Sequence, residues 1–181
     1  ILHIDAHADL RVAYLGFAEA HASIMHNALA LDGIARLVGV GWRDVGQAEV
    51  RRTASDARIV PVWDRDLGRA ALHGRSFARV ADGIVASLPP KVHVSFDIDG
   101  LDPSLCPGTG TPVPGGLSFR EACFLLARVA AAREIVSFDL CEVAPGSGDS
   151  EWDANVGARV LYKLAGAALR SREPGWGGDL G

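Results

Sequence analysis

The chain opens with Ile1-Leu2-His3-Ile4-Asp5-Ala6-His7-Ala8-Asp9, in which a strand-like run passes directly into carboxylates and a histidine. Two later strand-like runs are followed by acidic residues in the same way: Val92–Phe96 by Asp97 and Asp99, and Ile135–Phe138 by Asp139 and Glu142. If these runs are parallel strands of one open sheet, their carboxyl ends share the edge at which such folds bind ligands. Negative charge gathered in one place is unfavourable unless cations neutralise it, so the sequence predicts a metal-dependent enzyme.

Strand-like and helical patterns alternate along the rest of the chain. Two further buried strands are expected over Ile34–Val40 and Arg58–Val62. The spacing of apolar residues predicts helices over residues 21–31, 46–54, 77–88, 118–132 and 155–169, with Ser118 as an N-cap. Five strands that alternate with helices are typical of a parallel sheet covered on both faces. We expect one domain over residues 1–170 and a loose, glycine-rich tail over residues 171–181.

Composition limits the classes of partner. The 181 residues suit one domain, and the hydrophobic fraction of 49% is ordinary for a globular protein. A net charge of -4 without a basic cluster gives no support for a nucleic-acid partner, and we expect no membrane partner because no apolar run approaches the length of a span. Three cysteines without metal-ligand spacing predict reduced thiols in a cytoplasmic protein. Because Ile1 falls inside a strand-like run, we expect the chain to be a fragment that lacks an amino-terminal part.

The acidic blocks have the composition of a metal site. Asp5, His7 and Asp9 are spaced i, i+2, i+4, so an extended backbone would point their side chains the same way, and Asp97 and Asp99 repeat this spacing. Hard oxygen ligands with one imidazole suit Mn²⁺ better than Zn²⁺, Co²⁺ or Ni²⁺. The four carboxylates are too many for one ion and suit two ions that share bridging ligands. A lone aspartate would be a solvated turn residue, but five ligands in two matched blocks favour the metal site.

A long segment rich in glycine and proline, residues 97–117, follows the second acidic block. Prolines fix φ and glycines allow tight bends, so this segment is expected to hold one wall of the site in a fixed shape. Loops of this length without regular structure are uncommon unless they are functional.

The motifs of this chain resemble those of the ureohydrolase family, which includes arginase and agmatinase. The resemblance lies in three segments: Asp5–Asp9, Ser95–Pro103 with its continuation Pro107–Pro112, and Asp139–Pro145. In order and spacing it extends from residue 1 to about residue 169. It implies a three-layer α/β/α fold of the arginase/deacetylase type, two Mn²⁺ ions, and hydrolysis of a guanidino group to urea and an amine.

Carried over by position, the resemblance implies a role for each site residue. Asp5 and Asp97 would bridge the two metal ions. His7 and Asp99 would complete the coordination of one ion, and Asp9 would bind the other. Asp9 would also orient a hydroxide held between the ions. Glu142 would pair with the guanidinium nitrogens, for which a carboxylate is a planar partner. His21 would shuttle protons, a role for which imidazole side chains are commonly used.

Two departures from the family pattern affect these expectations. The family supplies one more histidine ligand in a Gly-Gly-Asp-His block upstream, which this chain does not contain, so we expect weak metal retention and poor stability. His21 is followed by Ala22-Ser23 where the family has Gly or Ser and then Thr, and its alternative role is a helix-start residue without a catalytic part. The remaining histidines fit no motif and are expected to be structural or surface residues: His3, His26, His73 and His93.

The substrate interpretation rests on two positions. Gly46 stands where arginase has an acidic residue that binds the substrate's α-amine, and the stretch from Asp9 to Gly16 is closer to bacterial agmatinases. Agmatine, cleaved to putrescine in polyamine biosynthesis, is therefore the first substrate hypothesis, with arginase and guanidinobutyrase as alternatives. Arg11 would either bind a substrate carboxylate or form a salt bridge with a neighbouring acidic residue. Family resemblance implies a homo-oligomer, trimer or hexamer, and the alternative from another class is a non-catalytic fragment or oligomer subunit.

Overall fold

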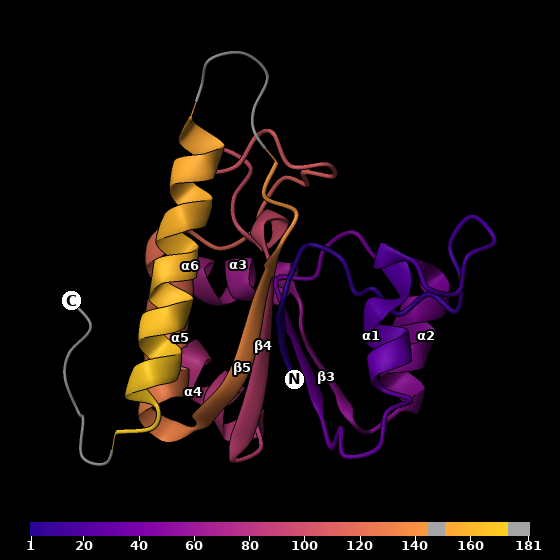
Figure 1. Cartoon of the computed structure of the whole chain (residues 1–181), viewed down its shortest axis with the longest axis horizontal. Coiled ribbons are helices and arrows are strands. Elements are labelled where there is room, and N and C mark those ends of the chain that lie inside the picture. Colours follow the sequence, from indigo (N-terminus) through magenta and orange to yellow (C-terminus); the bar gives the residue numbers. More distant parts are fainter. Residues whose placement is uncertain (145–150, 174–181) are drawn as a thin grey trace.

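One parallel sheet of five strands forms the centre of the computed structural model, which describes residues 1–144 and 151–173 (Figure 1). The strands are β1 Leu2–Ile4, β2 Leu37–Val40, β3 Ile59–Val62, β4 Lys91–Asp97 and β5 Glu134–Cys141. They lie in the order β3-β2-β1-β4-β5, and every neighbouring pair is parallel. The predicted α/β fold with a parallel sheet is confirmed.

Helices cover the sheet on both faces, so the fold has three layers. The helical elements are η1 His21–Ser23, α1 Ile24–Ala28, α2 Gln47–Ser55, α3 Asp64–Leu72, α4 Phe77–Ser87, η2 Ile98–Gly100, α5 Phe119–Ala132 and α6 Trp152–Arg170. The helices α4, α5 and α6 lie on one face, and α1 and α2 lie on the other (Figure 1). None of the helices in the described ranges is both long and apolar enough to cross a membrane.

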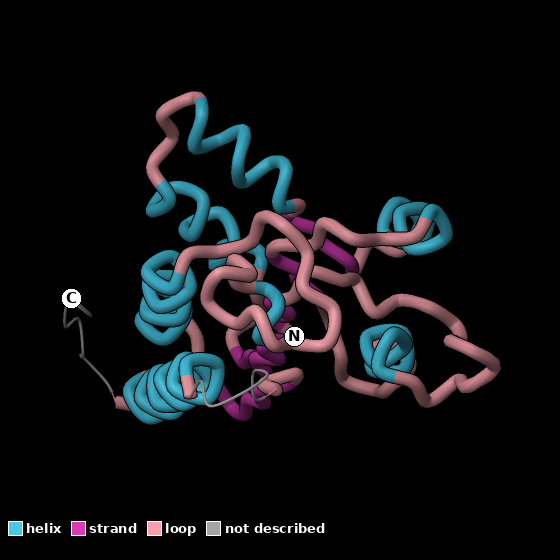
Figure 2. Tube along the Cα trace, turned by 90° about the horizontal axis from the view of Figure 1, so that it is seen from above, coloured by secondary structure: helices cyan, strands magenta, loops and turns pink. Residues whose placement is uncertain are grey.

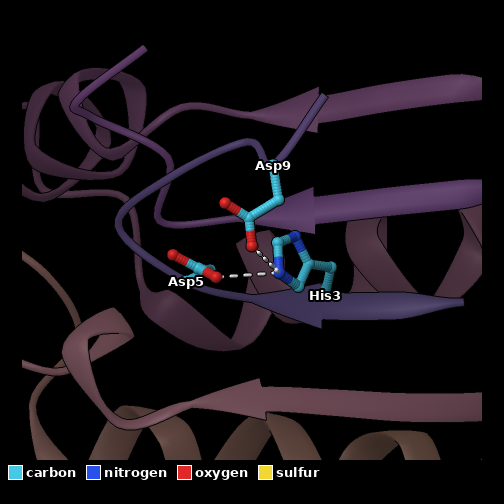
Figure 3. Close-up of side chains that lie close together, drawn as sticks. All are labelled: His3, Asp5 and Asp9. Atoms are coloured by element: carbon cyan, nitrogen blue, oxygen red, sulfur yellow. Dashed lines mark ion pairs between the residues drawn. The ribbon is translucent and has the colours of Figure 1, made fainter. Parts of the chain in front are cut away.

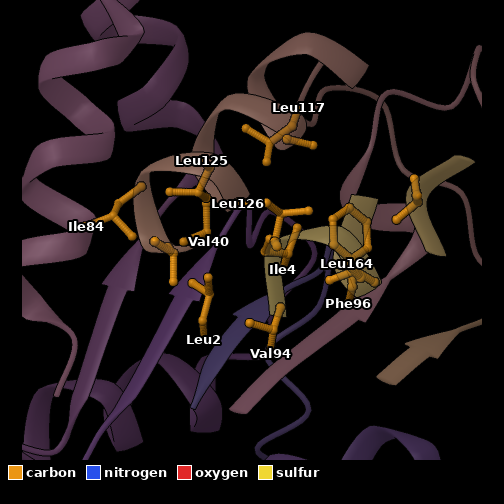
Figure 4. Packing of buried hydrophobic residues seen from close by; sticks show 14 of the residues in the cluster. Leu2, Ile4, Val40, Ile84, Val94, Phe96, Leu117, Leu125, Leu126 and Leu164 are labelled. Atoms are coloured by element: carbon orange, nitrogen blue, oxygen red, sulfur yellow. The ribbon is translucent and has the colours of Figure 1, made fainter. Parts of the chain in front are cut away.

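The alternation of side chains along the strands builds two hydrophobic cores. Leu2 and Ile4 of β1 join Val94 and Phe96 of β4 in the larger core, where they meet residues of the three long helices such as Leu125 (Figure 4). The opposite face of the sheet holds a smaller core beneath α1. Residues of β1 that point away from the larger core therefore lie in this second layer.

Two helices differ from the sequence expectation. No helix was predicted over Asp64–Leu72, yet α3 forms there. This helix, which is described in full, has no completely buried side chain. Its apolar residues are few, but Leu67, Ala70 and Ala71 fall at helical spacing, so a sequence signal was available. The expected helix over residues 21–31 is shorter and begins as a 3-10 turn. The Ser118 cap is confirmed, because its Oγ accepts the Glu121 N–H at 3.2 Å while the Glu121 carboxylate accepts the Ser118 N–H at 2.9 Å.

The path of the chain places a crevice beside β1. From β1 the chain moves outward to β2 and β3, and then returns to form β4 on the other side of β1. The strand order therefore reverses between β1 and β4, and open parallel sheets bind ligands outside the carboxyl ends at such a reversal. Seen from above, loops lie over the middle of the molecule and helices surround them (Figure 2).

The end of the chain and part of the third motif fall outside what the structure describes. The expected loose tail over residues 171–181 lies outside the described residues from position 174 onward, as does Pro145 of the third motif. The described beginning of that tail contacts β5: Ser171 Oγ accepts the Ile135 N–H at 3.0 Å, and Arg172 donates to the Val136 carbonyl oxygen at 3.1 Å.

We expect the Leu125→Ala substitution to lower the free energy of unfolding by about 2–5 kcal/mol, because it opens a cavity in the larger core. Leu125 is completely buried, whereas Leu72 at the end of α3 is 90% exposed and is a matched control. Leu72→Ala should change the free energy of unfolding by no more than about 0.5 kcal/mol. Denaturant unfolding of both variants measures the difference, and equal effects would contradict the placement of the core.

Candidate metal centre

The segment after β1 turns sharply and brings its acidic side chains toward β4. The expected extended backbone over residues 5–9 is wrong, because the chain bends at Asp5 and Ala6 and Asp9 has a φ of 52°. The bend is held by the His7 N–H, which donates to Asp5 Oδ1 at 2.6 Å, and by the Ala6 N–H, which donates to Asp99 Oδ1 at 3.0 Å. The turn, not strand alternation, therefore groups these side chains.

The site contains two overlapping groups of possible ligand atoms. Asp5, His7 and Asp99 form one group, and His3, Asp5 and Asp9 form the other; within each, the ligand atoms lie within 4.8 Å of one another. His7 Nδ1 is 3.3 Å from Asp5 Oδ1 and 3.1 Å from Asp99 Oδ2. Figure 3 shows the His3 imidazole facing both Asp5 and Asp9. Asp5 belongs to both groups, so its carboxylate lies at the centre of the candidate site.

All seven residues expected from the sequence line one pocket of about 360 Å³. These residues are Asp5, His7, Asp9, His21, Asp97, Asp99 and Glu142. Asp97 begins a 3-10 turn in which its Oδ1 accepts the Asp99 N–H at 2.9 Å. Glu142 has a φ of 59°, and its carbonyl oxygen accepts a hydrogen bond from Thr109 Oγ1 at 3.0 Å. The structure thus brings three sequence-distant motifs to one cavity.

The crowded carboxylates change one another's pKa. Burial, together with the charges of Asp5 and Asp99, raises the pKa of Asp97 to about 9. Burial and the charge of Asp5 raise the pKa of Asp9 to about 7. Hydrogen bonds to Asp5 and Asp99 raise the pKa of His7 to about 10. Without a cation, the site therefore holds protons at neutral pH.

The donor set fits divalent metal ions. Four carboxylates supply hard oxygen atoms, and one imidazole supplies nitrogen, a combination that suits Mn²⁺ and related ions. The raised pKa values of Asp9 and Asp97 mean that cations would replace protons in the pocket. The pattern of shifted carboxylates in a cleft is also typical of functional sites.

Two further residues at the site were not predicted as functional. His3 was expected to be structural or on the surface, but it is 1% exposed and its Nε2 lies 2.8 Å from Asp5 Oδ2. The i, i+2 spacing from His3 to Asp5 within a strand was the available signal. Glu49 is buried, lines the pocket, and accepts the N–H groups of Leu10 at 3.0 Å and Gly46 at 2.8 Å.

Arg43 holds the wall of the pocket formed by residues 97–117. Its Nη2 donates to the carbonyl oxygens of Asp99 at 2.7 Å and Val113 at 2.8 Å, and its Nε donates to Val113 at 3.1 Å. Thr111 in this wall lines the pocket, and its Oγ1 lies 3.3 Å from Asp99 Oδ2. The expectation that this segment forms a shaped wall agrees with these contacts.

Arg11, Tyr14 and His21 form a cluster in the lining of the pocket. The Arg11 guanidinium is 4.9 Å from the centre of the Tyr14 ring, and Tyr14 makes an edge-on contact with His21 at 5.2 Å between ring centres. Arg11 Nε also lies 3.9 Å from Glu49 Oε2. The positive charge of Arg11 is therefore already engaged by protein groups.

The fold and the pocket define an α/β protein with a candidate metal centre at the carboxyl edge of a parallel sheet. The arginase family model matches residues 1–166, and the chain belongs to this family. The resemblance to ureohydrolases expected from the three motifs is thereby confirmed.

Known relatives and structures agree with this membership. The chain is 35% identical to N(1)-aminopropylagmatine ureohydrolase of Thermus thermophilus, over 97% of this chain and 55% of that protein. It is 31% identical to guanidinobutyrase of Pseudomonas aeruginosa, over 91% of this chain and 51% of that protein. The structure of proclavaminate amidino hydrolase from Streptomyces clavuligerus superposes with a TM-score of 0.78 at 29% identity, over 94% of this chain and 55% of that one. The chain thus spans about half the length of the relatives that it matches.

As pH rises, we expect the free energy of unfolding of the metal-free chain to fall and the stabilisation by added Mn²⁺ to grow. The folded, metal-free chain keeps protons on His7 and Asp97 up to pH values of about 10 and about 9, whereas the unfolded chain has released them by about pH 7.5. Its free energy of unfolding should therefore fall as pH rises from about 7 to 9. Mn²⁺ competes with the same protons, so the stabilisation by added Mn²⁺ should grow over this range.

Urea unfolding at several pH values, with Mn²⁺ or with a chelator, measures both trends. Asp97→Asn is the control, because it removes one of the retained protons and should flatten the metal-free trend. A metal-free stability that rises with pH over this range would contradict the proton-holding site.

Proposed function

We propose that the protein hydrolyses a guanidino group to urea and an amine at a dinuclear metal centre, with Mn²⁺ as the ion. The observation that carries this proposal is the convergence of four carboxylates and one imidazole in the same pocket as Glu142: Asp5, His7, Asp9, Asp97 and Asp99. Membership of the arginase family supports the reaction class. The assignment of residues to roles below is part of the proposal.

The chain offers ligands for both ions. In the proposed arrangement Asp5 and Asp97 would hold both ions, His7 and Asp99 would hold one of them, and Asp9 would hold the other. The ions would supply hydroxide at neutral pH by lowering the pKa of bound water. The protein's own part is to present deprotonated ligands in a fixed geometry, which the N–H groups donated to Asp5 and Asp99 support.

Glu142 and His21 would act on the substrate. A carboxylate binds a guanidinium through two parallel hydrogen bonds, so Glu142 would orient the planar group in the pocket. The hydrogen bond from Thr109 to the Glu142 carbonyl oxygen fixes the backbone that carries this carboxylate. His21 would donate a proton to the departing amine. Its imidazole lines the pocket and makes an edge-on contact with the Tyr14 ring.

The charges around the pocket favour a substrate that carries another positive group besides its guanidinium. Asp44 and Glu49 add carboxylates to the lining beyond the proposed metal ligands. Arg11 also lines the pocket, but Glu49 Oε2, 3.9 Å from its Nε, and the Tyr14 ring offset its charge. Gly46 has no side chain with which to bind an α-amine. We therefore propose agmatine, with N(1)-aminopropylagmatine as a longer cationic alternative suggested by the Thermus relative.

The first test is urea release from agmatine, N(1)-aminopropylagmatine, arginine and 4-guanidinobutyrate. The assay uses the Mn²⁺-loaded 181-residue chain and, in parallel, the product of its complete reading frame. We expect Asp97→Asn to lower urea release by at least about 100-fold, because a lost bridging ligand weakens transition-state stabilisation by several kcal/mol. Asp66→Asn, in an exposed carboxylate of α3, is the control and should leave the rate unchanged.

Each outcome has a distinct meaning. Urea from one substrate far above the others would establish the class and identify the substrate. Bound metal without urea from any of the four would exclude them as substrates. Neither metal nor urea in the complete product would refute catalysis and favour a non-catalytic subunit. Light scattering on the same preparation tests the proposed trimer or hexamer.

Arg11→Ala separates amine-bearing from carboxylate-bearing substrates. Because Arg11 is partly exposed and already paired, its removal should change kcat/KM for agmatine by no more than about fivefold. Arg51→Ala, on the exposed surface of α2, is the matched control. A selective loss of activity toward 4-guanidinobutyrate, with agmatine the poorer substrate in the unaltered protein, would count against agmatine.

A further inference from the structure

A buried histidine and a buried tryptophan lie behind Asp5 and have no part in the proposed reaction. His3 and Trp42 are each 1% exposed, and their rings meet edge-on at 5.8 Å between centres. His3 belongs to β1 and points away from the larger core, toward the layer of α1 and α2. A polar pair this deeply buried is costly unless its hydrogen bonds are satisfied.

The place of Trp42 depends on Gly39. Gly39 lies directly opposite His3 in the register of β1 and β2. A Cβ atom at position 39 would lie 2.0 Å from Cζ2 of the Trp42 ring, a distance that no packing allows. Only glycine at this position leaves room for the indole beside His3.

The indole nitrogen determines which form of His3 fits. Trp42 Nε1 is 3.1 Å from His3 Nδ1. An indole N–H can only donate, so His3 Nδ1 must accept and carries no proton. A neutral imidazole has one N–H, which must then be on Nε2. Trp42 thus selects one tautomer of His3.

His3 Nε2 in turn faces Asp5. It lies 2.8 Å from Asp5 Oδ2 and 4.0 Å from Asp9 Oδ2 (Figure 3). With the proton on Nε2, His3 donates to Asp5 and has no lone pair there for a metal ion, although its position in the ligand group resembles that of a ligand. The other oxygen of Asp5 accepts the His7 N–H at 2.6 Å. Both Asp5 oxygens are therefore held in place.

We propose that Gly39, Trp42 and His3 form a network of contacts that positions the Asp5 carboxylate for metal binding. In this network His3 is a positioning residue rather than a metal ligand. This inference rests on the proposed function only in assigning a metal ion to Asp5. Groups that hydrogen-bond to a metal ligand fix its orientation and typically contribute a factor of about 10–100 to metal affinity.

The tautomer of His3 is measured without metal. Nitrogen-15 NMR of the histidine side chains in the metal-free chain, at about pH 9 where an ordinary imidazole is neutral, distinguishes the two N–H forms. The His3 signal is assigned by its disappearance in His3→Gln. We expect the Nε2–H form in the unaltered chain and a detectable Nδ1–H form in Trp42→Phe, which keeps an aromatic ring but removes the donor. A proton on Nδ1 in the unaltered chain, whether in place of the Nε2 proton or in addition to it, would overturn the proposal.

Mn²⁺ titration then separates positioning from ligation. His3→Leu should weaken Mn²⁺ binding by about 10–100-fold, whereas His3→Gln, whose amide can still donate to Asp5, should stay within about threefold of the unaltered chain. His73→Gln, at an exposed histidine, is the control. An equal loss in both His3 variants would show that His3 is itself a ligand and overturn the proposal. Failure of both the unaltered chain and the product of its complete reading frame to bind Mn²⁺ would refute the metal-binding role together with the proposed function. The tautomer measurement tests the network of contacts around His3 independently of metal.

Discussion

The fold must hold several carboxylates close together at the carboxyl edge of the sheet although their negative charges repel one another. The reversal of strand order between β1 and β4 places Asp5 next to Asp97 and Asp99, where mutual repulsion opposes folding. Each of these three carboxylates accepts a backbone N–H: Asp5 from His7, Asp97 from Asp99, and Asp99 from Ala6. The main chain thus offsets part of the repulsion through the turns that present the side chains, so the shape of these turns and the charge of the site are inseparable.

Much of the architecture follows from local patterns in the sequence. Strand-like runs separated by helical spacing indicated the parallel sheet, and Ser118 marked the start of a helix as its N-cap. The residues that line the pocket could also be predicted from the sequence, because parallel strands end at a common edge and acidic residues follow three of them. Both signals are local, and both depend on periodicity or on a short motif. Helix α3 was missed although Leu67, Ala70 and Ala71 follow helical spacing, because most of its residues are polar or small.

Other features could not be predicted because they depend on contacts between distant residues. The bend at Asp5 and the left-handed backbone of Asp9 replace the extended geometry expected from the i, i+2, i+4 spacing. The importance of His3 emerges only when Trp42 is seen above Gly39 on the neighbouring strand. Sequence spacing within one strand indicates that His3 and Asp5 share a face, but it carries no information about the donor behind the histidine.

The contacts of Arg43 suggest how such a pocket could diversify. In the described part of the chain, its hydrogen bonds go to main-chain carbonyl oxygens, including those of Asp99, Leu101 and Val113. A carbonyl oxygen is present whatever side chain its residue carries. The path of the wall is therefore anchored independently of the side chains that it displays, such as Thr111. Evolution could exchange those side chains, and with them the molecules that the pocket accepts, without rebuilding the scaffold.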